Sequence, residues 1–86
     1  MDKDKLYELK AEASQLKPII NIGKNGVTAP VVEEIRKHLK ANRMIKMKLL
    51  KSSREEKDTT AIAEELAQAT GSQVIEIRGN SVVLYK

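Results

Sequence analysis

Cysteine is absent from this chain of 86 residues, and so are phenylalanine and tryptophan. Without cysteine, the chain has neither a disulfide framework nor a thiolate metal site, so packing alone must hold the fold together. The absence of cysteine also fits a cytoplasmic protein. Because two tyrosines are the only aromatic residues, a platform of aromatic side chains on which nucleic-acid bases stack is nearly excluded.

Long apolar runs are missing as well. No stretch approaches the roughly 18–20 apolar residues that a membrane-spanning helix needs. The N-terminus, Met1-Asp2-Lys3-Asp4, is charged and lacks the apolar segment of a signal peptide. A chain of 86 residues is too short for two hydrophobic cores, so we expect a single domain over residues 1–86.

The residues that catalysis or metal binding requires are scarce. His38 is the only histidine, and no sequence pattern supplies it with a nucleophile, a carboxylate partner or further metal ligands. No paired carboxylates at a defined site and no nucleophile elbow are present. The sequence therefore predicts a protein that is not an enzyme and that holds no metal or cofactor.

Positive charge is concentrated in the middle of the chain. The formal net charge is +4, but residues 17–57 contain 11 Lys or Arg against 4 Glu, a local charge of +7. A basic middle flanked by acidic ends suggests a directed positive surface and a polyanionic partner. The alternative is a solvated surface whose charge only maintains solubility, and composition does not decide between the two.

Hydrophobic periodicity predicts the order helix, strand, helix, strand, helix, strand, strand. The helices are expected over residues 4–16, from an N-cap at Thr28 up to the second strand, and from Ser53 to Thr70. The last of these begins with capping-box spacing between Ser53 and Glu56 and is stopped by Gly71. The strands are expected at residues 19–22, 44–50, 73–78 and 81–85.

These elements predict an α/β fold. The strand–helix–strand unit should be a right-handed crossover between parallel strands. Gly79-Asn80 joins the last two strands as an antiparallel hairpin. The result is a compact α-β-α-β-α-β-β sandwich with a mixed four-stranded sheet. Because no apolar heptad stripe is left over for a partner, we expect a monomer.

The tetrapeptide Gly23-Lys24-Asn25-Gly26 falls between a predicted strand and a predicted helix. Backbone amides at a helix start point outward and carry partial positive charge, so such an end binds phosphate readily. Glycines at both corners permit positive φ and let a phosphate approach without meeting a Cβ. A Gly-X-X-Gly loop beside a helix is how one RNA-binding module clamps the backbone, although two glycines at this spacing are also common in ordinary turns.

Basic side chains follow this loop. One group lies on a flank of the predicted second helix, and a second group lies on the polar face of the strand after it, which alternates with Ile45, Met47 and Leu49 and should have one wet face. We therefore predict contacts with a polyanion at Gly23, Lys24, Asn25, Gly26, Thr28, Arg36, Lys37, Lys40, Lys46 and Lys48.

Several motifs occur in an order that resembles a known family. They are Leu16-Lys17-Pro18, the loop Ile22-Gly23-Lys24-Asn25-Gly26-Val27-Thr28, the strand Met44-Ile45-Lys46-Met47-Lys48, the helix stop Thr70-Gly71, and the ending Gly79-Asn80-Ser81-Val82-Val83-Leu84-Tyr85-Lys86. Together they resemble the CRM domain family (chloroplast RNA splicing and ribosome maturation), most closely its stand-alone prokaryotic, YhbY-like members. Some members continue with a basic tail after the position of Tyr85, and no RNA contact by such a tail is expected here.

The resemblance implies RNA binding through the Gly-X-X-Gly loop and the nearby basic surface. It implies association with precursors of the large ribosomal subunit, and a fold similar to the C-terminal domain of translation initiation factor three. Two other hypotheses stay open at this point. One is a DNA-coating chromatin protein, which predicts dimers and little preference for RNA. The other is a protein-docking module whose basic surface is incidental.

Overall fold

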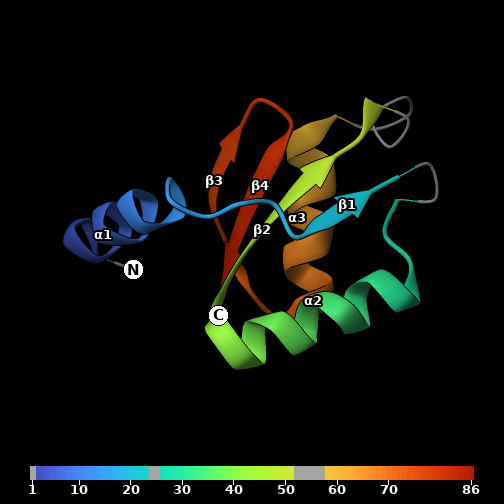
Figure 1. Cartoon of the computed structure of the whole chain (residues 1–86), viewed down its shortest axis with the longest axis horizontal. Coiled ribbons are helices and arrows are strands. Elements are labelled where there is room, and N and C mark those ends of the chain that lie inside the picture. The colour runs from blue at the N-terminus through green and yellow to red at the C-terminus, as the bar shows by residue number, and fades with distance from the viewer. Residues whose placement is uncertain (1, 24–25, 52–57) are drawn as a thin grey trace.

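Three helices and a four-stranded sheet form, in the predicted order, within residues 2–23, 26–51 and 58–86, which the computed structural model describes (Figure 1). The strands are β1 (Ile20–Ile22), β2 (Met44–Leu49), β3 (Gln73–Arg78) and β4 (Ser81–Tyr85). The helices are α1 (Lys3–Ala13), α2 (Ala29–Asn42) and α3 (Thr59–Thr70). Figure 1 shows α1 beside β3 at the left, α2 below the sheet and α3 behind it.

The sheet has the strand order β1-β2-β4-β3 and is mixed, as predicted. β1 and β2 are parallel neighbours, and α2 is the crossover between them. β4 pairs antiparallel with both β2 and β3. Gly79 takes φ +58° in the β3–β4 turn, the left-handed region that a two-residue hairpin turn with glycine first requires.

Each face of the sheet has its own hydrophobic cluster. The larger cluster joins one face to α2 and α3 and includes Ile35, Ile45, Met47, Leu66 and Leu84. The smaller cluster joins the opposite face to α1 and consists of Leu9, Ala13, Met44, Ile75 and Val83. Because side chains alternate across a strand, neighbouring residues such as Met44 and Ile45 enter different clusters.

The prediction that β2 has one wet face was therefore only partly right. Met44 is buried under α1, Lys46 is half-buried and Lys48 is exposed. The polar face is thus covered at one end and open at the other. Alternation along β2 could not indicate this, because the covering residues belong to α1, which is far away in the sequence.

A bulge interrupts the pairing of β3 with β4. The pairing of β3 with β4 passes from Val74 opposite Leu84 to Glu76 opposite Val83, which leaves Ile75 without a partner. An extra residue of this kind turns the side chains that follow toward the other face. Val74 packs against the larger cluster and Ile75 belongs to the smaller one, and Glu76, which pairs with Val83, lies on the same face as Ile75.

The helix ends follow local capping chemistry. The Asp2 carboxylate accepts a hydrogen bond from the Lys5 N–H at 2.8 Å, and α1 ends at Ala13, before the predicted end at residue 16. Gly71 caps α3 at φ +67°, as predicted. The start of α3 differs from the prediction: the helix begins at Thr59, after an N-cap at Asp58. The predicted capping-box pair, Ser53 and Glu56, lies outside the described residues.

The N-cap of α3 gives a direct stability prediction. The Asp58 carboxylate accepts a hydrogen bond from the Ala61 N–H at 2.7 Å. Because that bond satisfies a donor that the helix itself leaves open, Asp58→Ala should lower the free energy of unfolding by about 1 kcal/mol. Urea titration measures the loss. Ser53→Ala is the comparison, and a larger loss in that variant would support the earlier helix start that the sequence predicted.

Among the helices of the described segments, none is both long enough and apolar enough to cross a bilayer. The described residues also contain no group of three or more His, Cys, Asp or Glu side chains that could hold a metal ion.

Candidate nucleic-acid interface

One end of the sheet brings together three segments that are distant in sequence. The Leu50 N–H donates to the Ile22 carbonyl at 2.9 Å, which holds the end of β1 against the end of β2. The Leu49 N–H donates to the Asn80 carbonyl at 2.7 Å, which holds the β3–β4 turn against β2. Gly23 directly follows β1 at this same end, and Leu50 is its neighbour there, with Leu50 Cδ1 3.9 Å from where a Cβ of Gly23 would lie.

The two glycines of the predicted loop have different roles. The Gly26 N–H donates to the Gly23 carbonyl at 2.9 Å, which closes the turn, and Gly26 has φ +62°. Gly23 is not among the residues with positive φ, and a Cβ there would meet Leu50 Cδ1 at an ordinary 3.9 Å. Only Gly26 therefore needs glycine for the backbone. Lys24 and Asn25 lie outside the described residues.

Replacing Gly23 and Gly26 by alanine, one at a time, should distinguish an effect on folding from an effect on binding. Gly26→Ala should cost roughly 1–2 kcal/mol of stability, because a Cβ is unfavourable in the left-handed region even where space is open. Gly23→Ala should leave the thermal midpoint almost unchanged but should weaken RNA binding by about threefold or more, if a phosphate comes as close as glycine allows. Unchanged binding by Gly23→Ala would mean that nothing approaches that backbone.

The start of α2 is capped as predicted but offers fewer donors to an anion than the sequence argument assumed. The Thr28 hydroxyl accepts from the Val31 N–H at 3.5 Å, and the Thr28 carbonyl accepts from the Val32 N–H at 2.9 Å. Pro30 has no N–H at all. A phosphate near this end must therefore rely on nearby side chains as well as on backbone amides.

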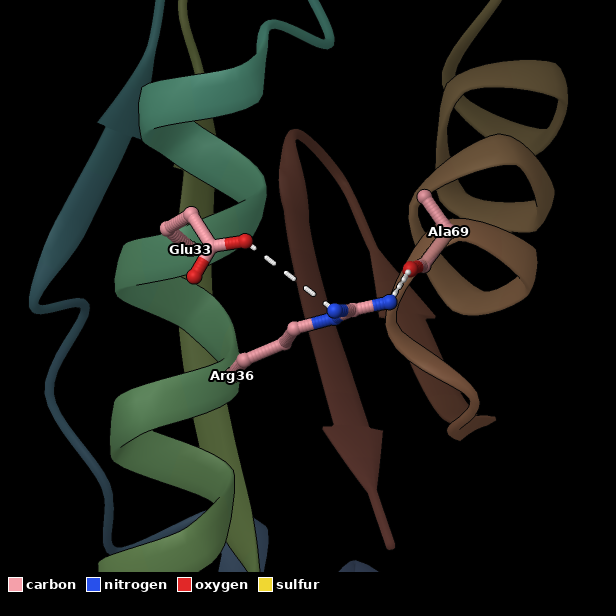
Figure 2. A network of polar contacts seen from close by, with 3 residues as sticks. All are labelled: Glu33, Arg36 and Ala69. Atoms are coloured by element: carbon pink, nitrogen blue, oxygen red, sulfur yellow. Dashed lines mark hydrogen bonds and ion pairs between the residues drawn. The ribbon is translucent and has the colours of Figure 1, made fainter.

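Arg36, one of the predicted contacts, is engaged within the protein (Figure 2). Its guanidinium donates to the Ala69 carbonyl at 3.0 Å and lies 4.0 Å from the Glu33 carboxylate. Ala69 is in the last turn of α3, where carbonyls have no partner within the helix and a cation is favourable. Arg36 thus links α2 to the end of α3, and a contact with RNA would compete with that link.

The other two basic residues of α2 lie in different surroundings. Lys37 shares a hollow with Glu33, Glu34 and His38, so its charge is opposed locally. Lys40 lines an open hollow of about 670 Å³ near the end of α2, together with Arg36, Leu39, Arg43 and Lys86. This cluster of positive charge lies toward the opposite end of the sheet from Gly23. Arg43 directly precedes β2 and Lys86 directly follows β4, and the Lys86 N–H donates to the Arg43 carbonyl at 2.9 Å.

The structure does not bring all the predicted contacts onto one surface. Lys46 and Lys48 lie on the face of the sheet that α1 partly covers, whereas α2, with Lys37 and Lys40, packs on the opposite face. Their closeness along the chain was the reason to expect them on one surface. In the fold, the sheet separates the two groups.

Arg78 is an exposed basic residue near Lys48 that the sequence analysis missed. Lys48 pairs with Ser81 across β2 and β4, and Ser81 pairs with Arg78 across β4 and β3. Arg78 directly precedes the turn residue Gly79, so the predicted hairpin already placed Arg78 opposite Ser81. The missing information was that β4 lies beside β2.

The sequence model of the CRS1 / YhbY (CRM) domain matches residues 1–86. The chain belongs to the CRS1 / YhbY (CRM) domain family. This confirms the resemblance seen in its motifs. Over 78 residues, this CRM domain is 36% identical to the "probable RNA-binding protein YqeI" of Bacillus subtilis, covering 91% of this chain and 79% of that protein.

A second relative and a solved structure agree with this assignment. The "probable RNA-binding protein MJ0652" of Methanocaldococcus jannaschii is 33% identical over 78 residues, which cover 91% of this chain and 58% of that protein. The solution structure of SAV1595 from Staphylococcus aureus, a protein itself proposed to bind RNA, superposes with a TM-score of 0.82 at 27% identity. That match covers 100% of this CRM domain and 88% of the other chain.

Proposed function

We propose that this CRM domain binds RNA by its backbone, through the Gly23–Gly26 turn and the basic side chains beside it. The observation that carries the proposal is that the end of β1, the end of β2 and the β3–β4 turn lie together at one end of the sheet, where the Gly23–Gly26 turn follows β1. Relatives across bacteria and an archaeon are named RNA-binding proteins, which supports RNA over DNA as the partner.

The chemistry of the surface supports recognition of sugar and phosphate rather than of stacked bases. Tyr85 packs against the smaller cluster, with the Lys5 ammonium 5.8 Å from its ring centre. Tyr7 lies on α1, away from the Gly23 end of the sheet. No aromatic side chain from the described residues is thus available beside the turn. Basic side chains and small polar side chains remain to contact the RNA.

For the biological partner, we propose a precursor of the ribosomal RNA of the large subunit, with the protein acting as a cytoplasmic monomer during assembly. The support is the likeness to stand-alone, YhbY-like members of the family. Crosslinking the protein to RNA in cells and sequencing the fragments tests this assignment. Fragments drawn mainly from mature transfer or messenger RNA would contradict it, and sedimentation as a stable dimer at micromolar concentration would contradict the monomer.

Salt dependence tests the mode of binding. If about four to six phosphates are neutralised, log K should fall against log salt concentration with a slope of roughly −3 to −5. The titration uses an RNA hairpin and a DNA hairpin of the same sequence at the same salt concentrations. A slope near zero would contradict backbone binding, and equal affinity for both hairpins would favour a DNA-coating protein instead.

A further inference from the structure

Strand register places four polar residues in one continuous row across the whole sheet. Asn21 of β1 pairs with Lys48 of β2, Lys48 pairs with Ser81 of β4, and Ser81 pairs with Arg78 of β3. Paired residues of neighbouring strands share a face, so all four side chains lie on the face opposite α2 and α3. Asn21, Lys48 and Arg78 are exposed and Ser81 is half-buried.

This row lies at the open end of its face. The next row inward contains Lys46, Val83 and Glu76, and the one after that contains Met44, Tyr85 and Gln73. The smaller cluster under α1 takes up Met44 and Val83, and Tyr85 packs against it. The helix therefore covers the far end of the face, and it leaves the row that adjoins Gly23 and the β3–β4 turn uncovered.

The row alternates uncharged hydrogen-bonding groups with cations. Neighbouring strands are about 4.8 Å apart, so the row is roughly 14 Å long and its two cations are roughly 10 Å apart. Its order is amide, ammonium, hydroxyl, guanidinium. Along an RNA strand, phosphates alternate with ribose 2′-hydroxyls, which both donate and accept hydrogen bonds. Cations suit the first of these groups, and the amide and hydroxyl suit the second.

We propose that Asn21, Lys48, Ser81 and Arg78 form the part of the RNA interface that continues from the turn, with the cations on phosphates and the amide and hydroxyl on 2′-hydroxyls. This inference rests on the proposed function and assigns its second contact surface. The exposed end of this face carries a polar row, with Tyr85 two rows inward, and such a surface fits the wide, shallow minor groove of helical RNA, which displays those hydroxyls.

RNA could instead continue from the turn along the surface of α2, but that surface is less suited to it. The helix surface nearest the turn carries Glu33 and Glu34, which would repel phosphates before Lys37 is reached. Arg36 is held by Ala69 and Glu33. On the sheet face, Glu76 is the acidic residue within these rows, and it lies in the inner row opposite Val83.

Two double variants that remove the same charge distinguish RNA bound along the sheet face from RNA bound along α2. Lys48→Ala with Arg78→Ala and Lys37→Ala with Lys40→Ala each remove two positive charges. Affinity is measured for an RNA hairpin with a stem of about 16 base pairs, over a range of salt concentrations. The sheet variant should lose about tenfold or more in affinity, and its salt slope should become shallower by about two. The helix variant should lose less than about threefold and keep its slope.

Equal losses in the two variants would overturn the inference, because they would show that only the overall field matters. A larger loss in the helix variant would also overturn it. In either case the proposed function stands as long as a loop variant, Lys24→Asp with Asn25→Asp, abolishes binding. If the loop variant binds normally as well, the proposed function itself fails. Thermal midpoints are recorded for every variant, so that unfolding is not mistaken for lost contact.

The hydroxyl contacts have their own test. Asn21→Ala with Ser81→Ala leaves the charge unchanged, so affinity for a DNA hairpin of the same sequence should stay the same. Affinity for the RNA hairpin should fall by about fivefold, since the 2′-hydroxyl is what distinguishes RNA from DNA at such a site. Equal affinities of this variant and the unmodified protein for RNA would show that the row does not contact the ribose.

Discussion

Replacing Lys24 and Asn25 together by Asp should abolish most RNA binding while the fold survives. Gly23 and Gly26 remain, so the turn keeps its Gly23–Gly26 hydrogen bond and the positive φ of Gly26. The substitutions change the charge by −3 at the point where a phosphate must approach the start of α2. Because repulsion then opposes the contact, we expect at least about a tenfold loss of affinity, or about 1.4 kcal/mol. The measurement is a binding titration against an RNA hairpin.

The matched control makes the same change of charge on α1. Lys3→Asp with Lys10→Ala also changes the charge by −3, at exposed positions on the helix that covers the far end of the sheet. Lys5 is left in place because it contacts the Tyr85 ring. This control should keep binding within about threefold, since exposed charges farther away than a Debye length are largely screened. If the loop variant binds as well as the control, the Gly23–Gly26 segment is only a turn.

Leu66→Ala should cause the largest loss of stability of the substitutions considered. Leu66 is fully buried on α3, in the cluster between the sheet and the two helices α2 and α3. Truncation removes apolar contacts and leaves a cavity that strands on one side and helices on the other cannot close, at a cost of about 3–4 kcal/mol. For a domain of this size the thermal midpoint should fall by roughly 12–30 °C, measured by circular dichroism.

Leu9→Ala is the comparison for that experiment. Leu9 is 3% exposed in the smaller cluster, but α1 lies at one side of the sheet and can shift to fill the space. We therefore expect a loss of about 2 kcal/mol, in the lower part of the range for such truncations. A loss from Leu66→Ala no larger than that from Leu9→Ala would contradict the assignment of the main core to the α2 and α3 side.

The element order and the strand bounds after Gly71 could be predicted because local chemistry decides them. Alternating apolar residues, the Gly79-Asn80 turn and the Thr28 cap each act within a few positions. The start of α3 could not be predicted, because two capping signals compete there. Ser53 and Glu56 match the capping-box motif, whereas Asp58 is the residue whose side chain accepts a hydrogen bond from the Ala61 N–H.

Only the parts of the candidate site that are formed by residues close together in the sequence could be predicted. The turn between β1 and α2 could be predicted from its two glycines, and in the structure the Gly26 N–H donates to the Gly23 carbonyl. The division of the lysines between two faces depends on α2 packing against the face opposite Lys46 and Lys48, and the place of Arg78 near Lys48 depends on β4 lying between β2 and β3. Those are contacts between distant segments, and no spacing along the chain reports them. Arg36 is a similar case, since its partner Ala69 is on another helix.

The central claim is that RNA lies on the Gly23 end of the sheet, and a titration of the ¹⁵N-labelled protein with an unlabelled RNA hairpin tests it most directly. We expect the amide signals of Asn21, Gly23, Gly26, Lys48 and Arg78 to shift, and those of Lys40 and Lys86 to stay in place. Shifts confined to the cationic hollow at the end of α2, or no shifts at any RNA concentration, would contradict it.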